Sequence, residues 1–432
     1  MTKYYSPENV YDAAIDRIKI AFDEFDNILV SFSGGKDSGI MLNLAYDYAK
    51  KTNQLDKLAV YFLDYEAQYQ LTIDYVTSEF KRLKDVKRFW LCLPNKVPSA
   101  TSMSTGYWIP WDKDKKSIWV RKMPNYDFVI NEDNVPFDYH KGQLDYEIQE
   151  NFNKWFSNKY GKTGVFIGIR ADESLDRYRA IKSKNKVNTY KNFEYMVKRN
   201  DVTINVYPIY DWRVRDVWIA NGKYSYPYNH LYDLYYQAGM SINQMRVASP
   251  FLSEGLDSLK YYQVIEPDTW AKMVGRVNGA NFASIYGGTK AMAWKDIQLP
   301  KGYTWKSYLK FLLKTLPEKT RREYEKIFST SIKFWDKRGG VLSDRTIKEL
   351  EDAGIPIDIK GKTNYKTDKK AVTFHEYPDD APVTEFKTVP SYKRMCITIM
   401  KNDHTASYMG FSRTKAQQEK RRKAMEKYEK IL

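Results

Sequence analysis

Apolar residues in the first 250 positions follow two spacings, which together predict alternating strands and helices. Short continuous apolar runs predict buried strands, and apolar positions three or four residues apart predict helices. The expected strands are 28–32, 58–63, 88–93, 164–169 and 203–208, and the expected helices are 8–25, 39–45, 70–84, 141–159, 212–220 and 229–239. Strands that alternate with helices pair in parallel through right-handed crossovers, so we expect an α/β fold with a twisted parallel sheet flanked by helices.

The pattern changes after residue 250. Residues 251–300 contain a Gly- and Asn-rich piece and are expected to form a connector. Beyond them helical spacing dominates, at 305–316, 318–337, 344–353, 391–401 and 412–431. Because 432 residues exceed one typical core, we expect an α/β domain over 1–250 and a mainly helical domain over 301–432.

One long segment of the first domain follows neither spacing. Residues 95–140 are irregular and rich in Trp, Pro, Asp and Lys. Because aromatic residues are frequent there, the segment is expected to be an elaborated loop or lid rather than a disordered linker.

A glycine-rich turn joins the first expected strand to the helix that follows it. Its sequence is Ser33-Gly34-Gly35-Lys36-Asp37-Ser38. Glycines let backbone N–H groups approach phosphate oxygens, and a helix N-terminus favours negative charge. Lys36 adds a mobile positive charge, and the hydroxyls of Ser33 and Ser38 add donors. The turn therefore predicts a phosphate-binding loop, although its spacing differs from that of a Walker A loop; an ordinary serine-glycine turn is the alternative.

A second candidate segment follows the fourth expected strand. It reads Gly168-Ile169-Arg170-Ala171-Asp172-Glu173-Ser174-Leu175-Asp176-Arg177. The guanidinium groups of Arg170 and Arg177 suit phosphate or sulfate oxygens, and Glu173 would orient one of them or bind a ribose. Ligands of parallel sheets bind beyond the carboxyl ends of strands, so this segment, the glycine turn and Asp64 are expected to share one cleft. The alternative is a Glu–Arg cluster that only fixes the start of a helix.

Charge and cysteine content narrow the function classes. The net charge is +16, and residues 301–432 hold 30 Lys and Arg against 18 Asp and Glu, whereas residues 1–300 hold 40 against 36. A basic C-terminal third indicates a polyanion partner such as DNA or RNA, with a merely solvated basic surface as the alternative.

No apolar run is long enough for a membrane span and no signal peptide is evident, so a cytoplasmic protein is expected. With only Cys92 and Cys396 in the chain, no thiolate-held zinc or iron–sulfur cluster is expected.

At this point the motifs resemble a known family. The glycine turn resembles the PP-loop of the ATP-pyrophosphatase superfamily, whose members split ATP between the α- and β-phosphates. In the same order, the segments at 168–177, 208–212 and 228–232 resemble the phosphoadenosine phosphosulfate (PAPS) reductase branch, over roughly residues 25–250. The segments at 64–69 and 391–412 are similar to a subgroup with an extra C-terminal domain of uncharacterised function, which includes proteins described as co-activators of prophage gene expression.

The resemblance implies a nucleotide site and its partners. The nucleotide would be ATP or a related adenine nucleotide such as PAPS, with Mg²⁺ and without an iron–sulfur cluster. Subgroup members commonly work with a small ParB-like protein, which is therefore an expected partner. The implied nucleotide-binding residues are Ser33, Gly34, Gly35, Lys36, Asp37, Ser38, Asp64, Gly168, Arg170, Glu173 and Ser174.

Within that set, individual roles can be assigned. Lys36 would neutralise charge on the leaving pyrophosphate, and Asp37 would hold Mg²⁺ or the loop itself. Asp64 would contact ribose or metal. Arg170 and Arg177 would grip the acceptor or the α-phosphate, which makes Lys36, Asp37 and the two arginines the candidate catalytic residues.

The chain also departs from the family pattern. It lacks the Glu-Cys-Gly-Leu-His segment with which true sulfonucleotide reductases attack sulfur, and it lacks the family's Cys-x-x-Cys pair. Cys92 is expected in a strand and Cys396 in a buried helix, and neither setting favours a thiolate.

The favoured function is an ATP-using enzyme that adenylates an acceptor in nucleic-acid or sulfur metabolism. A nucleotide-sensing regulatory or DNA-binding protein of the prophage co-activator type, and a reductase that uses a partner's thiol, stay open as alternatives.

Overall fold

The chain divides into two compact units, which are described separately. The computed structural model describes residues 7–102, 106–173, 177, 181, 189–247, 249–252, 256–277, 279–280, 297, 299–360 and 369–411. The first unit, here called the sheet unit, comprises Met1–Val97, Trp108–Pro250 and Asp257–Asn281. The second, the helical unit, comprises Pro98–Tyr107, Phe251–Leu256 and Phe282–Leu432.

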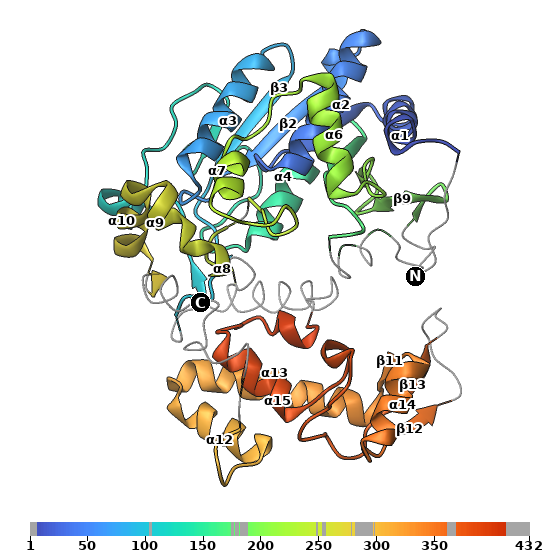
Figure 1. Ribbon diagram of the computed structural model, residues 1–432. Helices are drawn as coiled ribbons and strands as arrows, with labels where there is room; N and C mark the ends of the chain where they lie inside the picture. The colour runs from blue at the N-terminus through green and yellow to red at the C-terminus, as the bar shows by residue number, and fades with distance from the viewer. Residues whose placement is uncertain are drawn as a thin grey trace, which may run out of the picture. The chain divides into compact units, whose positions relative to one another are not determined.

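The sheet unit is built on one mostly parallel sheet, as the alternating pattern predicts (Figure 1). Within the described residues its strand order is β6-β3-β2-β1-β7-β10-β9-β8. The parallel strands are β1 (Asn27–Ser31), β2 (Leu58–Leu63), β3 (Lys87–Cys92), β6 (Val129–Asn131), β7 (Thr163–Ile167) and β10 (Thr203–Val206). The strands β9 (Phe193–Lys198) and β8 (Thr189–Tyr190) add an antiparallel edge. Central β1 pairs with β2 and β7, so the loop that follows β1 begins at the middle of the sheet.

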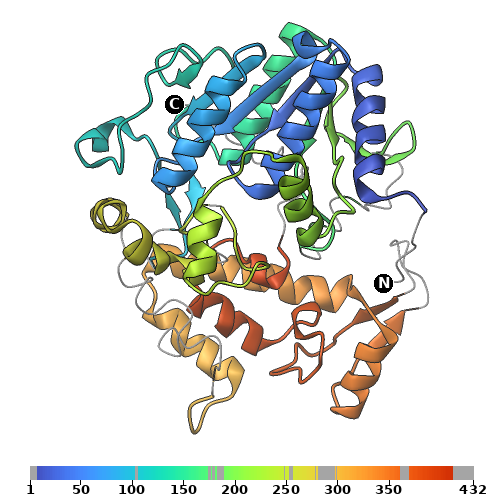
Figure 2. The ribbon, with the colours of Figure 1, turned by 45° about the horizontal axis from the view of Figure 1, so that its top comes forward.

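Helices cover both faces of this sheet (Figure 2). One face packs against α1 (Val10–Glu24), α2 (Lys36–Lys51), α3 (Gln70–Arg82) and α6 (Val214–Tyr224), and the other against α4 (Asp145–Tyr160). Successive strand residues point to opposite faces. Accordingly, Val30 of β1 joins the first cluster and Leu29 the second.

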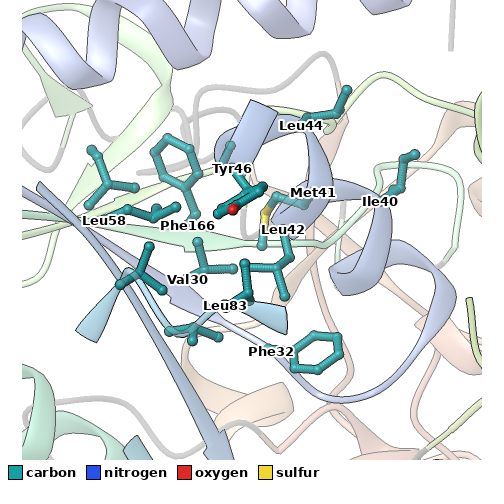
Figure 3. Packing of buried hydrophobic residues seen from close by; sticks show 14 of the residues in the cluster. Val30, Phe32, Ile40, Met41, Leu42, Leu44, Tyr46, Leu58, Leu83 and Phe166 are labelled. Atoms are coloured by element: carbon teal, nitrogen blue, oxygen red, sulfur yellow. The ribbon is translucent and has the colours of Figure 1, made fainter. Parts of the chain in front are cut away.

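The first of these cores fixes the start of α2. Side chains of α2 interdigitate with strand residues such as Val30 and Leu58 and with Phe166 of β7 (Figure 3). Moving each such large side chain out of water contributes about 1.5–3 kcal/mol to stability. The position of α2, and with it the glycine turn at its N-terminus, is therefore rigidly determined.

Residues 257–277 belong to the sheet unit rather than to a connector. They contain α9 (Tyr261–Ile265) and α10 (Pro267–Arg276), preceded by α8 (Leu256–Leu259). Tyr262 stacks on Tyr69 with ring centroids 3.5 Å apart. The carboxylate of Glu266 accepts hydrogen bonds from the backbone N–H groups of Gln70 (2.9 Å) and Leu71 (3.2 Å), which caps α3. The glycines and asparagines that suggested a connector begin only at the end of α10.

The helical unit contains the helices expected between 305 and 401. They are α12 (Trp305–Thr315), α13 (Glu318–Lys337), α14 (Asp344–Asp352) and α15 (Tyr392–Met400). Thr304, Ser343 and Ser391 accept hydrogen bonds at the starts of α12, α14 and α15, as polar N-cap residues do. A small antiparallel sheet adds β11 (Gly340–Leu342), β13 (Lys370–Thr373) and β12 (Asp358–Lys360). The expected helix 412–431 lies outside the described residues. Among the helices that are described, none is both long enough and apolar enough to cross a bilayer.

Candidate functional site

The glycine turn has the backbone geometry of an anion-binding loop. β1 ends at Ser31 and α2 begins at Lys36. Gly34 has φ +73°, in the left-handed region that favours glycine. The two serines brace the turn, because Ser38 Oγ accepts from the N–H of Ser33 and donates to the carbonyl of Gly35, both at 3.1 Å. The turn is thus braced by its own side chains at a helix N-terminus.

Replacing Gly34 by alanine should therefore destabilise the protein. A Cβ at this position would lie 2.8 Å from Cγ2 of Thr72, and the left-handed backbone adds about 1–3 kcal/mol of strain. Urea unfolding should show a lower midpoint. The matched control is Gly222→Ala in α6, where a Cβ meets nothing within 4 Å and helix propensity favours alanine. Equal stability of the two variants would contradict this account of the turn.

Lys36 is buried beneath the segment that contains α7 (Leu231–Gln237). Its backbone N–H donates to Tyr232 Oη at 3.0 Å, and its Nζ lies 3.4 Å from the carbonyl oxygen of Met245. From the same segment, Asn229 Nδ2 donates to the carbonyl of Gly34 at 2.9 Å. Burial, with the nearby Asp37 charge, raises the pKa of Tyr232 well above its usual value, so its hydroxyl stays protonated. These three residues cover the turn, and sequence reasoning gave none of them a role.

Arg170 lies directly against the turn. Its Nε contacts Asp37 Oδ1 at 2.6 Å, and its side chain is only 4% exposed. A Cβ on Gly168 would come within 2.9 Å of the backbone nitrogen of Ser38, so only glycine lets the end of β7 approach this closely. Asp37 also lies 3.0 Å from the Lys36 ammonium. One carboxylate therefore holds two cations, one from the loop after β7 and one from α2, beside the glycine turn.

The other residues of the second segment lie further from the turn. Glu173 Oε1 lies 3.9 Å from Arg170, and Glu173 Oε2 lies 3.5 Å from Arg177 Nε. Among the described residues, Arg177 is thus linked to Asp37 through Glu173 and Arg170. Its side chain is 45% exposed, against 4% for Arg170. Ser174, which the resemblance implied as a nucleotide contact, lies outside the described residues.

Asp64 has a different environment from the one expected. It is fully buried at the end of β2, where its carboxylate accepts from Trp90 Nε1 at 2.7 Å and from the backbone N–H of Glu66 at 2.8 Å. It also forms an ion pair with Arg121. Since protein donors occupy both oxygens, this carboxylate holds neighbouring chain segments in place rather than standing open to ribose or metal.

Glu66 organises the 95–140 segment, which contains β4 (Val97–Pro98), β5 (Tyr107–Trp108) and the 3-10 helix η2 (Lys113–Ile118). Its buried carboxylate accepts from the backbone N–H groups of Trp111 (2.7 Å) and Val120 (3.0 Å). Arg276 of α10 completes the arrangement, with Nε 2.9 Å and Nη2 3.1 Å from the same carboxylate. From Trp108 onward, the segment is thus an ordered insertion of the sheet unit, anchored by Asp64 and Glu66.

Neither cysteine is suited to nucleophilic chemistry. Cys92 is buried on β3, and burial together with the Asp64 charge raises its pKa well above the usual value. Cys396 is buried on α15, and burial raises its pKa to about 12. Both thiols are therefore protonated at neutral pH, as their sequence positions predict. In the described residues, no three His, Cys, Asp or Glu side chains gather where they could hold a metal ion.

Comparison with known proteins agrees with this architecture. The model of the phosphoadenosine phosphosulfate reductase domain matches residues 27–239, and that of a domain of unknown function (DUF3440) matches residues 239–420. The uncharacterized protein YbdN of Escherichia coli (strain K12) is 32% identical over 415 residues, which cover 95% of this chain and 92% of YbdN.

Two solved structures show more distant likeness. The phosphate complex of PAPS reductase from Candida auris is 15% identical and covers 54% of this chain and 94% of its own, at a TM-score of 0.29. The U34-tRNA thiolase NcsA from Methanococcus maripaludis, with its [4Fe-4S] cluster, is 13% identical. The match covers 67% of this chain and 84% of NcsA, at a TM-score of 0.32. The full-length match to YbdN and the order of the two domain models show that this chain belongs to the family in which a PP-loop domain of the PAPS reductase type is followed by DUF3440.

Proposed function

We propose that this protein binds ATP at the glycine turn and splits it between the α- and β-phosphates. An acceptor nucleophile would form a bond to the α-phosphorus, and the bond from that phosphorus to the α–β bridging oxygen would break. Pyrophosphate would leave with the electron pair, and the acceptor would carry the adenylyl group. The observation that supports this most is the left-handed Gly34 at the N-terminus of α2, with Lys36 and Arg170 both beside Asp37.

The charges around the loop suit a leaving pyrophosphate. Backbone N–H groups at a helix N-terminus favour anions, and two cations, Lys36 and Arg170, lie beside the turn. Asp37 holds both of them, and Asp172 also pairs with Arg170 at 2.5 Å. Both cations are almost fully buried, so their interaction with developing negative charge is weakly screened by water. Lys36 would exchange the carbonyl of Met245 for a phosphate oxygen when ATP binds. Arg170 would face the α-phosphate.

Mg²⁺ is proposed to arrive with ATP. Magnesium is usually held by one or two protein carboxylates together with substrate phosphates and water. Asp37 is the carboxylate at the turn, and Arg170 and Lys36 hold its Oδ1 and Oδ2. It would take such a role once Lys36 turns from Oδ2 to a phosphate oxygen. The ion would offset charge on the phosphates, and the protein's own contribution would be the N–H groups, Lys36 and Arg170.

Product analysis tests this proposal. Purified protein would be incubated with Mg·ATP and a cell extract as the source of acceptor, and nucleotides would be separated by anion exchange. The expected products are pyrophosphate and an equal amount of AMP or adenylated acceptor. ADP with inorganic phosphate would place the cleavage at the other bond and overturn the proposal.

Tyr232→Phe should tighten ATP binding. The Tyr232 hydroxyl accepts the Lys36 N–H that a phosphate would need, so removing the hydroxyl removes a competitor. One hydrogen bond of about 0.5–1.5 kcal/mol corresponds to roughly a two- to tenfold gain in affinity. Calorimetry would compare this variant with Tyr228→Phe, whose hydroxyl donates to Asp233 instead. Weaker binding in Tyr232→Phe would mean that the hydroxyl itself contacts the nucleotide.

The uneven charge favours a second candidate function, nucleic-acid binding by the C-terminal third. Residues 301–432 carry 30 basic against 18 acidic side chains. Each lysine or arginine contact to a DNA phosphate should steepen the fall of log affinity with log salt by about 0.9. The full-length protein should therefore be retained on heparin and should lose DNA affinity steeply between low and high salt. A flat salt series would remove this candidate.

A further inference from the structure

A cavity opens in the sheet unit at a place that the glycine turn does not reach. Its volume is about 740 Å³, within the range of small-molecule sites. Its lining residues come from the ends of β3 and β6, from the ordered insertion and from α10, and none of them belongs to segments 33–38 or 168–177. The cavity lies beyond the carboxyl ends of parallel strands, where such sheets bind ligands.

The lining of this cavity is predominantly basic. Five basic side chains face two acidic ones, Glu132 and Asp133. Lys113 is paired with both acids, at 3.6 and 2.5 Å, and Arg121 is paired with Asp64. The other three basic residues have no acidic partner in the described part of the chain: Lys116, Lys122 and Lys272. The uncompensated charge favours an anionic ligand.

One wall of the cavity is aromatic. Trp119 is partly exposed and rests at 5.1 Å, edge to face, on the fully buried Trp111. The indole N–H of Trp119 donates to the carbonyl of Asp112, and the indole N–H of Trp111 donates to the carbonyl of Asp64. Trp119 therefore offers a ring face rather than a hydrogen bond, as aromatic residues do when they stack on a flat ligand. The Lys116 ammonium lies 6.0 Å from the centroid of this ring, so a stacked base would lie close to that charge.

The wall is held in place before any ligand arrives. Within the insertion, Glu66 binds the backbone N–H groups on either side of η2, at Trp111 and Val120. Arg121 lies 4.9 Å from the Trp111 ring centroid, and its buried Nε has no hydrogen-bond partner in the described residues. A buried donor without a partner is costly, and a ligand oxygen would relieve that cost.

From these features we propose that this cavity binds a mononucleotide, with its base on Trp119 and its phosphate among Lys116, Lys122 and Lys272. The ring face supplies the surface for a planar base. The unpaired lysines supply the charge for a phosphate. The site is separate from the glycine turn and does not depend on ATP cleavage there.

Calorimetry with AMP on the Lys36→Ala protein tests the proposal, because this background weakens phosphate binding at the glycine turn. The expected result is one AMP per chain. Adenosine, which lacks the phosphate, and ribose 5-phosphate, which lacks the base, should each bind about tenfold more weakly or worse. If ribose 5-phosphate binds as tightly as AMP, the proposed stacking of the base on Trp119 is wrong. If adenosine binds as tightly as AMP, the proposed contact of the phosphate with the lysines is wrong.

A charge-reversal pair locates the site. Lys116→Glu/Lys272→Glu should weaken AMP binding by about tenfold or more, because like charges would then face the phosphate. The matched control is Lys19→Glu/Lys50→Glu, which makes the same charge change at exposed positions on α1 and α2. Trp119→Leu should weaken AMP about ten- to hundredfold and leave ribose 5-phosphate unchanged. No AMP binding in the Lys36→Ala background, or equal losses in the two charge pairs, would overturn the proposal.

Discussion

Replacing Lys36 by alanine should lower the rate of pyrophosphate formation by about a hundred- to a thousandfold, the usual effect of removing one preorganised donor from a developing anion. The ammonium is almost fully buried and, among the described residues, lies near Asp37, the carbonyl of Met245 and the face of the Tyr232 ring. Substrate binding should change less than the rate, because backbone N–H groups of the turn remain. Initial rates of pyrophosphate release at saturating Mg·ATP would measure the effect.

The control for this variant lies on the same helix. Lys50 is exposed in the last turn of α2, so Lys50→Ala removes the same charge without touching the glycine turn. Its rate should equal that of the wild type. A Lys36→Ala protein that unfolds at the wild-type urea concentration yet keeps the wild-type rate would contradict the role given to this lysine.

The largest effect on stability is expected for Glu66→Gln. This change leaves the Arg276 guanidinium buried without its counter-charge, and breaking a buried ion pair in this way typically costs about 3–5 kcal/mol. It also weakens the acceptor for the backbone N–H groups of Trp111 and Val120. Urea unfolding should show the loss, and limited proteolysis should cut first within residues 106–123.

A double variant separates the contribution of the ion pair to stability from that of the backbone hydrogen bonds to Glu66. Glu66→Met/Arg276→Met removes both charges, so it should be more stable than Glu66→Gln alone even though two backbone donors lose their acceptor. The exposed pair Glu318–Arg322 on α13 gives the surface control, and Glu318→Gln should change the unfolding midpoint little. A Glu66→Gln protein as stable as the Glu318→Gln control would contradict the anchoring role.

Much of the fold could be predicted from the sequence because its signals are local. The apolar runs at 28–32 and 58–63 became β1 and β2, and the helical spacing at 318–337 became α13. The meeting of the glycine turn with Arg170 could also be predicted, because both follow strands of one parallel sheet and such strands share an edge. Short β6 was hidden in the irregular 95–140 segment, since three residues carry no periodicity.

The features of the site that could not be predicted depend on residues that are far apart in the sequence. Tyr232 lies 196 positions after Lys36, and Arg276 lies 210 positions after Glu66. A carboxylate such as Glu66 or Asp64 reads from sequence as an ordinary polar loop residue, and only tertiary packing shows that it is buried against an arginine. Asp64 was assigned to the ligand, whereas in the structure its carboxylate contacts Trp90 of β3, the N–H of Glu66 and Arg121 of the insertion.

The central claim is that the turn at 33–38, with Arg170 beside it, receives the phosphates of a nucleotide. A crystal structure of the protein with Mg²⁺ and α,β-methylene-ATP, in which a methylene group replaces the α–β bridging oxygen and prevents cleavage, tests this most directly. The account predicts phosphate oxygens within hydrogen-bond distance of the Gly35 and Lys36 N–H groups and of the Lys36 ammonium, with Tyr232 moved off the Lys36 N–H. Triphosphate found only in the cavity beside Trp119, with the turn still closed by Tyr232 and Met245, would contradict it.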